Sequence, residues 1–520
     1  MSLSLIPCCS DCGVDVRPPA EEVCALPLQP LSDDEDGSPA SPALTSRSRL
    51  EALTNMFPEE SLVRSITLRK SLQQFGVLWR MPLAQSPQMA NFYDWSEPAQ
   101  GYDYFLSHAW RTSGWLKYFS LLLYSSHLFL LILMLVLASL VYAICMLDLL
   151  PTFGYVRLVA LDWTCLQSEL NPGCPTGPWV IGGGFLAVVS GLFIAPHLPS
   201  FCARSDLCFV DAACIHQASP EKKQAGIDAI AGFLSKSRQL RILWSPPYFS
   251  RLWCVFEIAA YRKVNPRGGL VFAPMFLERT VLLIVFGSFI MAGFFWIVDA
   301  NNYDPRVKGV CVAINPLILL VHLLRSNARD KTTLLQDLER FDLENVHCSL
   351  EADREFVMAA IDRWYGSPKA FTEYVRGPLR QELLKSATKF STTYIFLMTA
   401  PAICAALEDH LALWKARVPV RTAAAHFVAV VLGDYTLWMS FCMRMLIALC
   451  FYFDAKCRWK IIDYLLTIFI HVIFCGTAFA GELIGAEASR RGLWTACAFM
   501  VFAGALLVGI TRLTWGVCRA

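Results

Sequence analysis

Apolar runs of membrane-spanning length alternate with charged stretches along this chain. A helix that crosses a bilayer needs about 20 predominantly apolar residues. Eight segments approach that length, and because three of them are short, the pattern predicts six to eight spans. The eight segments are centred on residues 119–147, 179–196, 280–298, 307–324, 391–407, 423–453, 461–485 and 494–515. We therefore predict a polytopic α-helical membrane protein.

The charge of the connecting segments predicts how the chain crosses the membrane. Residues 197–279 and 325–390 are dense in Lys and Arg, whereas 148–178 contains Arg157 as its one basic residue. Because Lys and Arg favour the cytosolic side, the first two segments are predicted in the cytosol and the third outside it. An even number of spans then places both termini in the cytosol.

Composition agrees with a membrane protein. Hydrophobic residues make up 55% of the chain and charged residues 17%, and the mean hydropathy is +0.44. The formal net charge of +2 gives no indication of a nucleic-acid partner. The apolar composition makes the lipid bilayer the predicted partner. Most of the 20 cysteines are expected to be reduced. Cys165 and Cys174 flank a loop predicted outside the cytosol, where they would either form a disulfide or stay reduced.

Between the apolar runs lie short strands that alternate with helices. The strands are GYDYFLSHAW (101–110), SDLCFVDAACIHQ (205–217), QLRILWS (239–245) and GGLVFAPMF (268–276). Helical spacing of apolar residues follows the second strand, in 220–237, and the third, in 247–263. This alternation predicts a parallel α/β sheet that is covered on both faces.

These patterns divide the chain into seven segments. Residues 1–97 are rich in Pro, Ser and acidic residues and are predicted to form a disordered tail. The others are the first strand of the α/β domain (98–116), a transmembrane hairpin (117–199), the remainder of the α/β domain (200–278), a second hairpin (279–324), a cytosolic helical segment (325–390) and a C-terminal transmembrane bundle (391–520).

The α/β succession resembles a Toll/interleukin-1 receptor-like (TIR) domain. YDYFLSHAW is similar to the first strand of that family, CFVD to the second, ILWSPPYFSRLWCVFEIAAY to the third strand and its helix, and VFAPMF to the fourth strand. The resemblance covers about a hundred residues, and Ser-x-x-Tyr followed by Trp-Cys-x-x-Glu is its most specific part. The chain departs from the family where residues 117–199 replace the first crossover helix, so the domain is split by a membrane hairpin.

Ligands of open parallel sheets bind at the carboxyl ends of the strands. Here that edge is predicted to collect Ser107, His108, Trp110, Asp211, His216, Ser245 and Tyr248, with Trp253 and Glu257 on one face of the following helix. The two histidines have no Cys or carboxylate partner at ligand spacing, so no metal site is predicted. No resident cofactor is indicated either.

The resemblance implies two functions for this edge. In TIR enzymes that cleave the nicotinamide–ribose bond of NAD, the catalytic glutamate occupies the position of Glu257, which would make NAD a substrate and Ser107, His108, Trp110, Asp211, Ser245, Tyr248 and Trp253 its binding residues. In other TIR-like domains the same glutamate accompanies no hydrolysis. Such a domain would bind other TIR-like domains or itself, so we expect a membrane-anchored signalling protein with or without NAD cleavage.

Transport is the rival prediction, because ionisable residues inside a span are costly and often functional. Asp434 and Arg444 share the sixth predicted span, and His471 and Glu482 share the seventh. Asp434 and Arg444 are ten residues apart, about 15 Å along a helix, which is too far for a direct pair. The spans show neither a clear inverted repeat nor a pair of broken helices. The alternative is thus a transporter or channel that carries a TIR-like regulatory domain.

Overall fold

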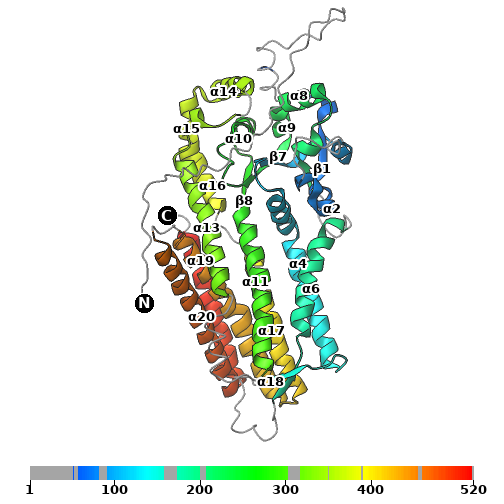
Figure 1. Ribbon diagram of the computed structural model, residues 1–520, viewed down its shortest axis with the longest axis vertical. Coiled ribbons are helices and arrows are strands. Elements are labelled where there is room, and N and C mark those ends of the chain that lie inside the picture. The colour runs from blue at the N-terminus through cyan, green and yellow to red at the C-terminus, as the bar shows by residue number, and fades with distance from the viewer. Residues whose placement is uncertain are drawn as a thin grey trace, which may run out of the picture. The chain divides into compact units, whose positions relative to one another are not determined.

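Long helices run side by side beneath a small sheet in the computed structural model of this protein (Figure 1). The residues that the structure describes fall within one compact unit, Ser46–Ala520. They are residues 51, 57–80, 91–156, 173–198, 206–301, 317–348, 351–387, 391–454 and 459–517.

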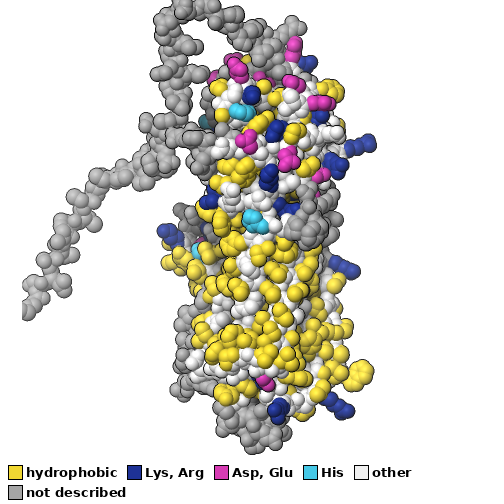
Figure 2. Space-filling model, turned by 90° about the vertical axis from the view of Figure 1, so that its right-hand side faces the viewer, with side chains coloured by type: hydrophobic (Ala, Val, Ile, Leu, Met, Phe, Trp, Pro, Cys, Tyr) yellow, Lys and Arg dark blue, Asp and Glu magenta, His cyan; other side chains and the backbone are white. Residues whose placement is uncertain are grey.

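Seven spans among the described residues are long and apolar enough to cross a membrane. Their hydrophobic side chains gather over the lower part of the molecule in Figure 2, while charged side chains lie mainly above. The architecture is therefore polytopic and helical, as predicted. The spans are α4 (Gly114–Met146), α6 (Trp179–Ile194, continued by η3, Ala195–His197), α11 (Met275–Ala300), α17 (Thr392–Lys415), the continuous α18–η6–α19 (Val420–His426, Phe427–Trp438, Met439–Tyr452), α20 (Lys460–Arg491) and α21 (Leu493–Val517).

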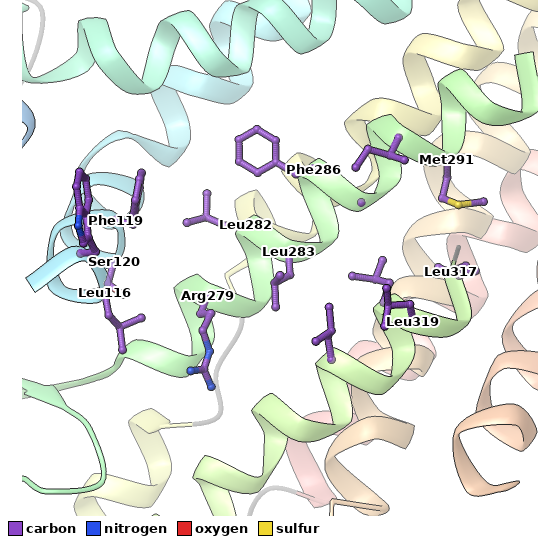
Figure 3. A pocket seen from close by; sticks show the side chains of 15 residues that line it. Leu116, Phe119, Ser120, Arg279, Leu282, Leu283, Phe286, Met291, Leu317 and Leu319 are labelled. Carbon is purple, nitrogen blue, oxygen red and sulfur yellow. The ribbon is translucent and has the colours of Figure 1, made fainter. Parts of the chain in front are cut away.

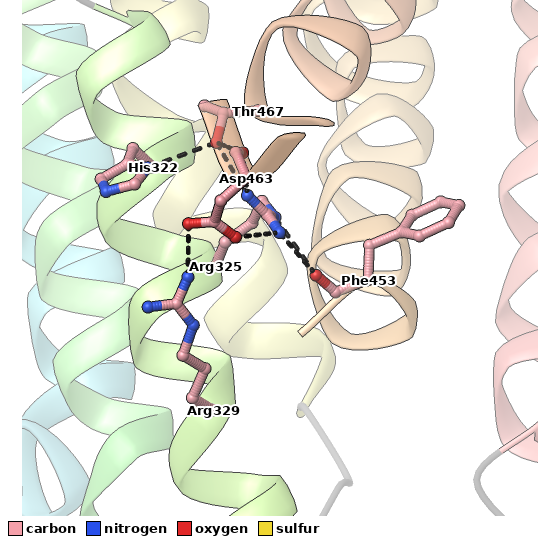
Figure 4. A network of polar contacts seen from close by, with 6 residues as sticks. All are labelled: His322, Arg325, Arg329, Phe453, Asp463 and Thr467. Carbon is pink, nitrogen blue, oxygen red and sulfur yellow. Dashed lines mark hydrogen bonds and ion pairs between the residues drawn. The ribbon is translucent and has the colours of Figure 1, made fainter. Parts of the chain in front are cut away.

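The predicted span at 307–324 lies mostly outside the described residues. Its described part, 317–324, begins α13 (Leu317–Glu339), which continues into a polar second half. Figure 4 shows how α13 is joined to α20: the guanidinium of Arg325 is fully buried and donates to Asp463 Oδ1 at 3.0 Å, to Thr467 Oγ1 at 2.9 Å and to the Phe453 carbonyl at 3.0 Å. Arg329 donates to the other Asp463 oxygen at 2.8 Å.

The sheet contains six strands in the order β2-β1-β6-β3-β7-β8. β3 pairs in parallel with β6 and β7, and β7 pairs in parallel with β8. These four are the strands predicted from the sequence, and they do lie side by side. Their near-continuous apolar runs suit strands buried on both faces. The strands are β1 (Arg64–Thr67), β2 (Glu97–Pro98), β3 (Tyr102–His108), β6 (Leu207–Phe209), β7 (Ser237–Trp244) and β8 (Gly269–Pro274).

The prediction of a disordered tail over residues 1–97 is wrong for part of that range. β1 pairs antiparallel with β6, and β2 pairs antiparallel with β1. The helical segment α2 (Leu68–Arg80) then packs on α4, and its chain breaks from helical geometry at Gln73–Gly76. Gly76 has φ +64°, and a Cβ there would overlap the ring of Tyr118. Composition misses this piece because four strand residues and a few buried side chains suffice to dock it.

The hairpin that separates β3 from β6 is part of the sheet's support. α4 begins six residues after β3 ends, at Gly114, and its Tyr124 hydroxyl accepts a hydrogen bond from Arg241 of β7 at 2.9 Å. The opposite ends of α4 and α6 carry a small antiparallel pair, β4 (Gly154–Val156) and β5 (Cys174–Thr176). Cys174 is buried in β5, whereas Cys165 lies outside the described residues, so their pairing stays a prediction.

The helical segment after α13 covers α10 (Leu252–Val264). The Leu252 amide donates to the His347 carbonyl at 3.0 Å, Tyr365 donates to the Ala259 carbonyl at 3.1 Å, and Arg262 pairs with Glu382. This segment comprises η4 (Leu343–Asn345), α14 (Glu351–Tyr365), α15 (Pro368–Tyr374), the π-helix η5 (Val375–Leu379) and α16 (Arg380–Ala387). The remaining short elements are η1 (Glu60–Leu62), η2 (Tyr93–Trp95), α7 (Asp211–Cys214), α8 (Pro220–Asp228) and α9 (Ile230–Ser235).

Candidate functional site

The predicted site residues converge where β3 and β7 end. In chain order the four parallel strands are arranged second, first, third, fourth, so the order reverses between β3 and β7. Ligands of doubly wound sheets bind at such a switch point. There the Ser107 hydroxyl lies 2.5 Å from the Tyr248 hydroxyl, and Thr112 bonds Ser245. A turn closed by the Tyr248 amide and the Ser245 carbonyl, at 2.9 Å, carries Tyr248 back over the strand end.

Glu257 lies in the second turn of α10, next to this hydroxyl pair. Its Oε2 atom is enclosed and has no hydrogen-bond partner among the described residues. Burial raises the pKa of Glu257 to about 8, the hydrogen bond from Ser107 opposes that rise, and the charge of Asp211 adds to it. At neutral pH the carboxyl group is mostly protonated, so it can donate a hydrogen bond.

Asp211 supplies the second carboxylate of the edge. Trp110 Nε1 donates to its Oδ2 at 2.9 Å, and the Ala212 amide donates to its Oδ1 at 2.8 Å. Burial raises the pKa of Asp211 to about 6, while the Ala212 amide, Lys117 and Trp110 hold it lower than burial alone would. Lys117 comes from the first turn of α4, with its ammonium 5.3 Å from the centre of the Trp110 ring.

The two predicted histidines have different surroundings. His108 is buried between the rings of Trp79 and Trp110, at centroid distances of 5.4 and 4.8 Å. Burial, with the positive charge of Lys117, lowers the pKa of His108 well below its usual value, so the imidazole is neutral. His216 instead accepts from the Ser219 amide at 3.1 Å and packs on Tyr93, which gives it a loop-closing role.

Trp253 and Cys254 connect α10 to its neighbours. Trp253 donates to Asp353 of α14 at 3.4 Å, and the Cys254 thiol donates to the His108 carbonyl at 3.5 Å. Burial raises the pKa of Cys254 well above its usual value, so it stays a thiol. Sequence reasoning missed Thr112, Lys117 and Asp353. The sequence does mark Lys117, because a charged residue at the start of an apolar run is unusual. Nothing in the sequence marks Asp353 as a residue of the site.

Exposure divides the site into two layers. Ser107, His108, Ser245 and Tyr248 are buried, whereas Trp110, Asp211, Trp253 and Glu257 remain partly exposed. The buried hydroxyls hold the strand ends and the start of α10 together, and the partly exposed side chains are those that a ligand would reach. Among the described residues, no group of three or more His, Cys, Asp or Glu side chains is placed to hold a metal ion.

A cavity of about 550 Å³ lies elsewhere, between α4, α11 and α13 (Figure 3). Its lining is mostly apolar, with Phe119, Phe286 and Leu319 facing it and Arg279 at one end. None of the predicted site residues lines it. Any ligand that reaches Glu257 would therefore approach across the partly exposed edge of the sheet rather than through this cavity.

The fold and the site define a polytopic helical protein with a parallel-rich sheet at one end of its helices. No family model, no curated protein and no solved structure matches the chain.

Proposed function

We propose that this protein is a membrane-anchored signalling protein in which the sheet serves as a TIR-like interaction module on the cytosolic side. The observation that carries the proposal is the meeting of Ser107, Tyr248 and Glu257 at the switch point between β3 and β7. A parallel sheet with a glutamate at this position is what the resemblance to TIR domains implies.

The connection between sheet and spans supports a signalling role. β8 ends at Pro274 and α11 begins at Met275, so no linker separates the edge of the sheet from a span. Arg241 of β7 stacks on Tyr124 of α4, 4.3 Å from the ring centre, and donates to its hydroxyl. A partner that shifts β3 against β7 would therefore also move α4 and α11, which links events at the two ends of these helices.

NAD cleavage is the second candidate function, and the state of Glu257 favours testing it. An ionised carboxylate would hydrogen-bond the ribose hydroxyls and stabilise the positive charge that develops on the sugar as nicotinamide leaves. Trp110 and Trp253 would provide apolar surfaces at the partly exposed edge. Because the pKa of Glu257 is about 8, we expect cleavage to increase between pH 7 and pH 9.

The test uses the full chain in lipid nanodiscs, incubated with NAD, with released nicotinamide as the readout. Glu257→Ala should abolish release, while Glu221→Ala, an exposed carboxylate on α8, should leave it unchanged. Fluorescence transfer between two differently labelled nanodisc populations would report association through the sheets. Association without NAD loss supports an interaction module alone, and the absence of both contradicts the proposal.

The alternative of a transporter rests on the ionisable residues of the spans. Asp434 and Arg444 form no ion pair with each other in the described part of the chain, in agreement with their spacing. Asp434 instead approaches Glu482 on α20, and this observation leads to a separate inference.

A further inference from the structure

Carboxylates from four spans gather in the helical bundle, from an exposed helix end inward. Asp409 of α17 lies close enough to Asp299 of α11 and Glu482 of α20 for their charges to repel, and Glu482 also faces Asp434 of η6. Glu408 is the neighbour of Asp409 on α17 and adds a fifth acid. We call these five residues the acidic cluster. It lies toward the helix ends opposite the sheet, since α11 ends at Ala300 and α17 at Lys415.

Two members of the acidic cluster carry an oxygen that is buried without a partner. Asp434 is 2% exposed, and its Oδ1 has no hydrogen-bond partner among the described residues. That oxygen points to α20, because a Cβ added to Gly481 would lie 2.6 Å from it. Glu408 is 1% exposed, and while its Oε1 accepts from the Val180 amide, its Oε2 has no partner in the same described set. An unsatisfied carboxylate oxygen in such a place is costly unless something binds it.

The backbone around Asp434 is also unusual. η6 is a π-helix that runs from Phe427 to Trp438. π-helical geometry usually appears as single-turn bulges, frequently at functional sites. Gly481 then lets the Asp434 carboxylate and the Trp438 ring approach the α20 backbone, where any side chain would collide with both. The local geometry therefore places this carboxylate against Glu482.

Positive side chains do not neutralise the centre of the acidic cluster. Among the described residues, no Lys, Arg or His forms an ion pair with Asp409, Asp434 or Glu482. Lys415 acts on Glu408 but pairs with Asp148 at 3.6 Å. Carboxylates this close in a low-dielectric surrounding cannot all be ionised, so the cluster must take up a positive charge.

Other titratable groups face the same carboxylates. Tyr435 of η6 and Cys442 of α19 both interact with Asp434. On α17 and α18, His410 and His426 lie with ring centres 5.7 Å apart, and His410 is bonded to Tyr142 at 2.8 Å. None of these groups supplies a fixed positive charge.

Exposure decreases stepwise from one end of the acidic cluster to the other. Asp299 is exposed at the end of α11, Asp409 and Glu482 are partly exposed, and Asp434 is buried. A small cation could therefore enter at Asp299 and pass inward to Asp434. This gradient is what an access route to a buried site requires.

Polar side chains continue from the acidic cluster along the buried face of α20. His471 is buried one turn from Cys475, whose sulfur lies 3.6 Å from the imidazole Nε2. Thr467 and Asp463 follow at further four-residue steps, and both belong to the network around Arg325 in Figure 4. Glu482 lies seven residues, about two turns, beyond Cys475 and so on the same helix face, at the end of a polar stripe that reaches toward the sheet.

We propose that the acidic cluster is an intramembrane proton-binding site in which Asp434 and Glu482 hold the proton and Asp299 and Asp409 form its entry. A proton is the fitting occupant because the described residues contain no group placed to hold a metal ion. The site shares no residue with the sheet or with the NAD-cleavage site, so its test is independent of the test of the proposed function.

Infrared spectroscopy of the full chain in lipid nanodiscs tests the site directly, because protonated carboxyl groups have a separate C=O stretch. In a pH titration the wild-type protein should retain this signal at neutral pH. Asp434→Asn and Glu482→Gln should each remove intensity equal to about one carboxyl group. Glu487→Gln serves as the matched control, since this exposed α20 carboxylate pairs with Arg490 and Arg491 and should contribute nothing.

Size-exclusion chromatography and thermal unfolding establish that each variant is folded, and the partly exposed Glu482 provides the milder change if Asp434→Asn does not fold. Equal neutral-pH signals in the wild type, Asp434→Asn and Glu482→Gln would overturn the proposal. A signal that falls saturably when Na⁺ or K⁺ is added at constant pH would also overturn it, because the occupant would then be an alkali metal ion.

Discussion

The Ser107 hydroxyl lies 2.5 Å from the Tyr248 hydroxyl, although 141 residues and two spans separate them along the chain. Both side chains are buried, so neither can exchange this partner for water. The contact joins the end of β3 to the turn that leads into α10. It therefore ties the segment before the membrane hairpin to the segment after it.

Removing either hydroxyl should weaken the sheet. Ser107→Ala leaves the Tyr248 hydroxyl with only its longer, 3.4 Å bond to the Cys254 carbonyl, and Tyr248→Phe leaves the Ser107 hydroxyl with Glu257, so each change should cost up to about 1–3 kcal/mol. Thermal unfolding in nanodiscs would measure the loss. The double variant should cost less than the sum of the single changes, because the interaction is already absent after the first. Strict additivity would show that the two hydroxyls do not act as a pair.

Glu257 should make stability depend on pH. The group ionises near its ordinary value of 4.5 in the unfolded chain but near 8 in the folded protein, so unfolding releases a proton between those values. The free energy of unfolding should then fall as pH increases through this window, by at most about 1.4 kcal/mol per pH unit. Partial exposure of the side chain reduces that slope.

Glu257→Gln removes this dependence. Its melting temperature should exceed that of the wild type at pH 8 and match it at about pH 3, since below its ordinary pKa of 4.5 the wild-type carboxyl is protonated in both states. The measurement is the melting temperature of the wild type and of Glu257→Gln at each of the two pH values. An equal difference at both would mean that Glu257 is not buried as a neutral acid.

The network of Figure 4 should be a major contributor to the packing of α13 on α20. Asp463→Ala leaves the buried Arg325 charge without its carboxylate, and breaking such a pair costs about 3–5 kcal/mol. We expect a clear fall in the melting temperature. Glu487→Ala is the control on the same helix, because its pairs with Arg490 and Arg491 are exposed and contribute little. A similar effect of both changes would contradict a special role for Arg325.

Gly76 should resist substitution. Its positive φ and its contact with the Tyr118 ring leave no room for a methyl group, so Gly76→Ala should loosen α2 from α4 by at least about 1 kcal/mol. Gly182→Ala offers the comparison, because the α6 glycine has an open surrounding and a helical backbone. There alanine should be neutral or slightly stabilising. Limited proteolysis near residue 80 would report the detachment of α2.

The spans and the four parallel strands were predictable because each depends on local patterns. QLRILWS is a short apolar run that ends at Ser-Pro-Pro, and the membrane runs have the length that a bilayer demands. β1 was not predictable, because Arg-Ser-Ile-Thr offers one large apolar residue and its partner, β6, lies far along the chain.

The site shows the same division. Ser107, Tyr248 and Glu257 could be brought together because strand ends of a parallel sheet meet at one edge. The acidic cluster could not, since the sequence indicates the depth of Asp434 and Glu482 in their helices but not the rotation of one helix against another. The approach of Asp434 to α20 depends on Gly481 and lies in a π-helical segment, and only the packed bundle reveals both.

β3 and β6 are neighbours in the sheet, yet α4 and α6 lie between them in the chain. During synthesis β3 is made before its two neighbours, because β6 and β7 follow α4 and α6 in the chain. If one of these two helices failed to insert, β3 and β6 would lie on opposite sides of the lipid, each with an unpaired edge. Closure of the sheet thus requires that both helices of the hairpin cross the membrane.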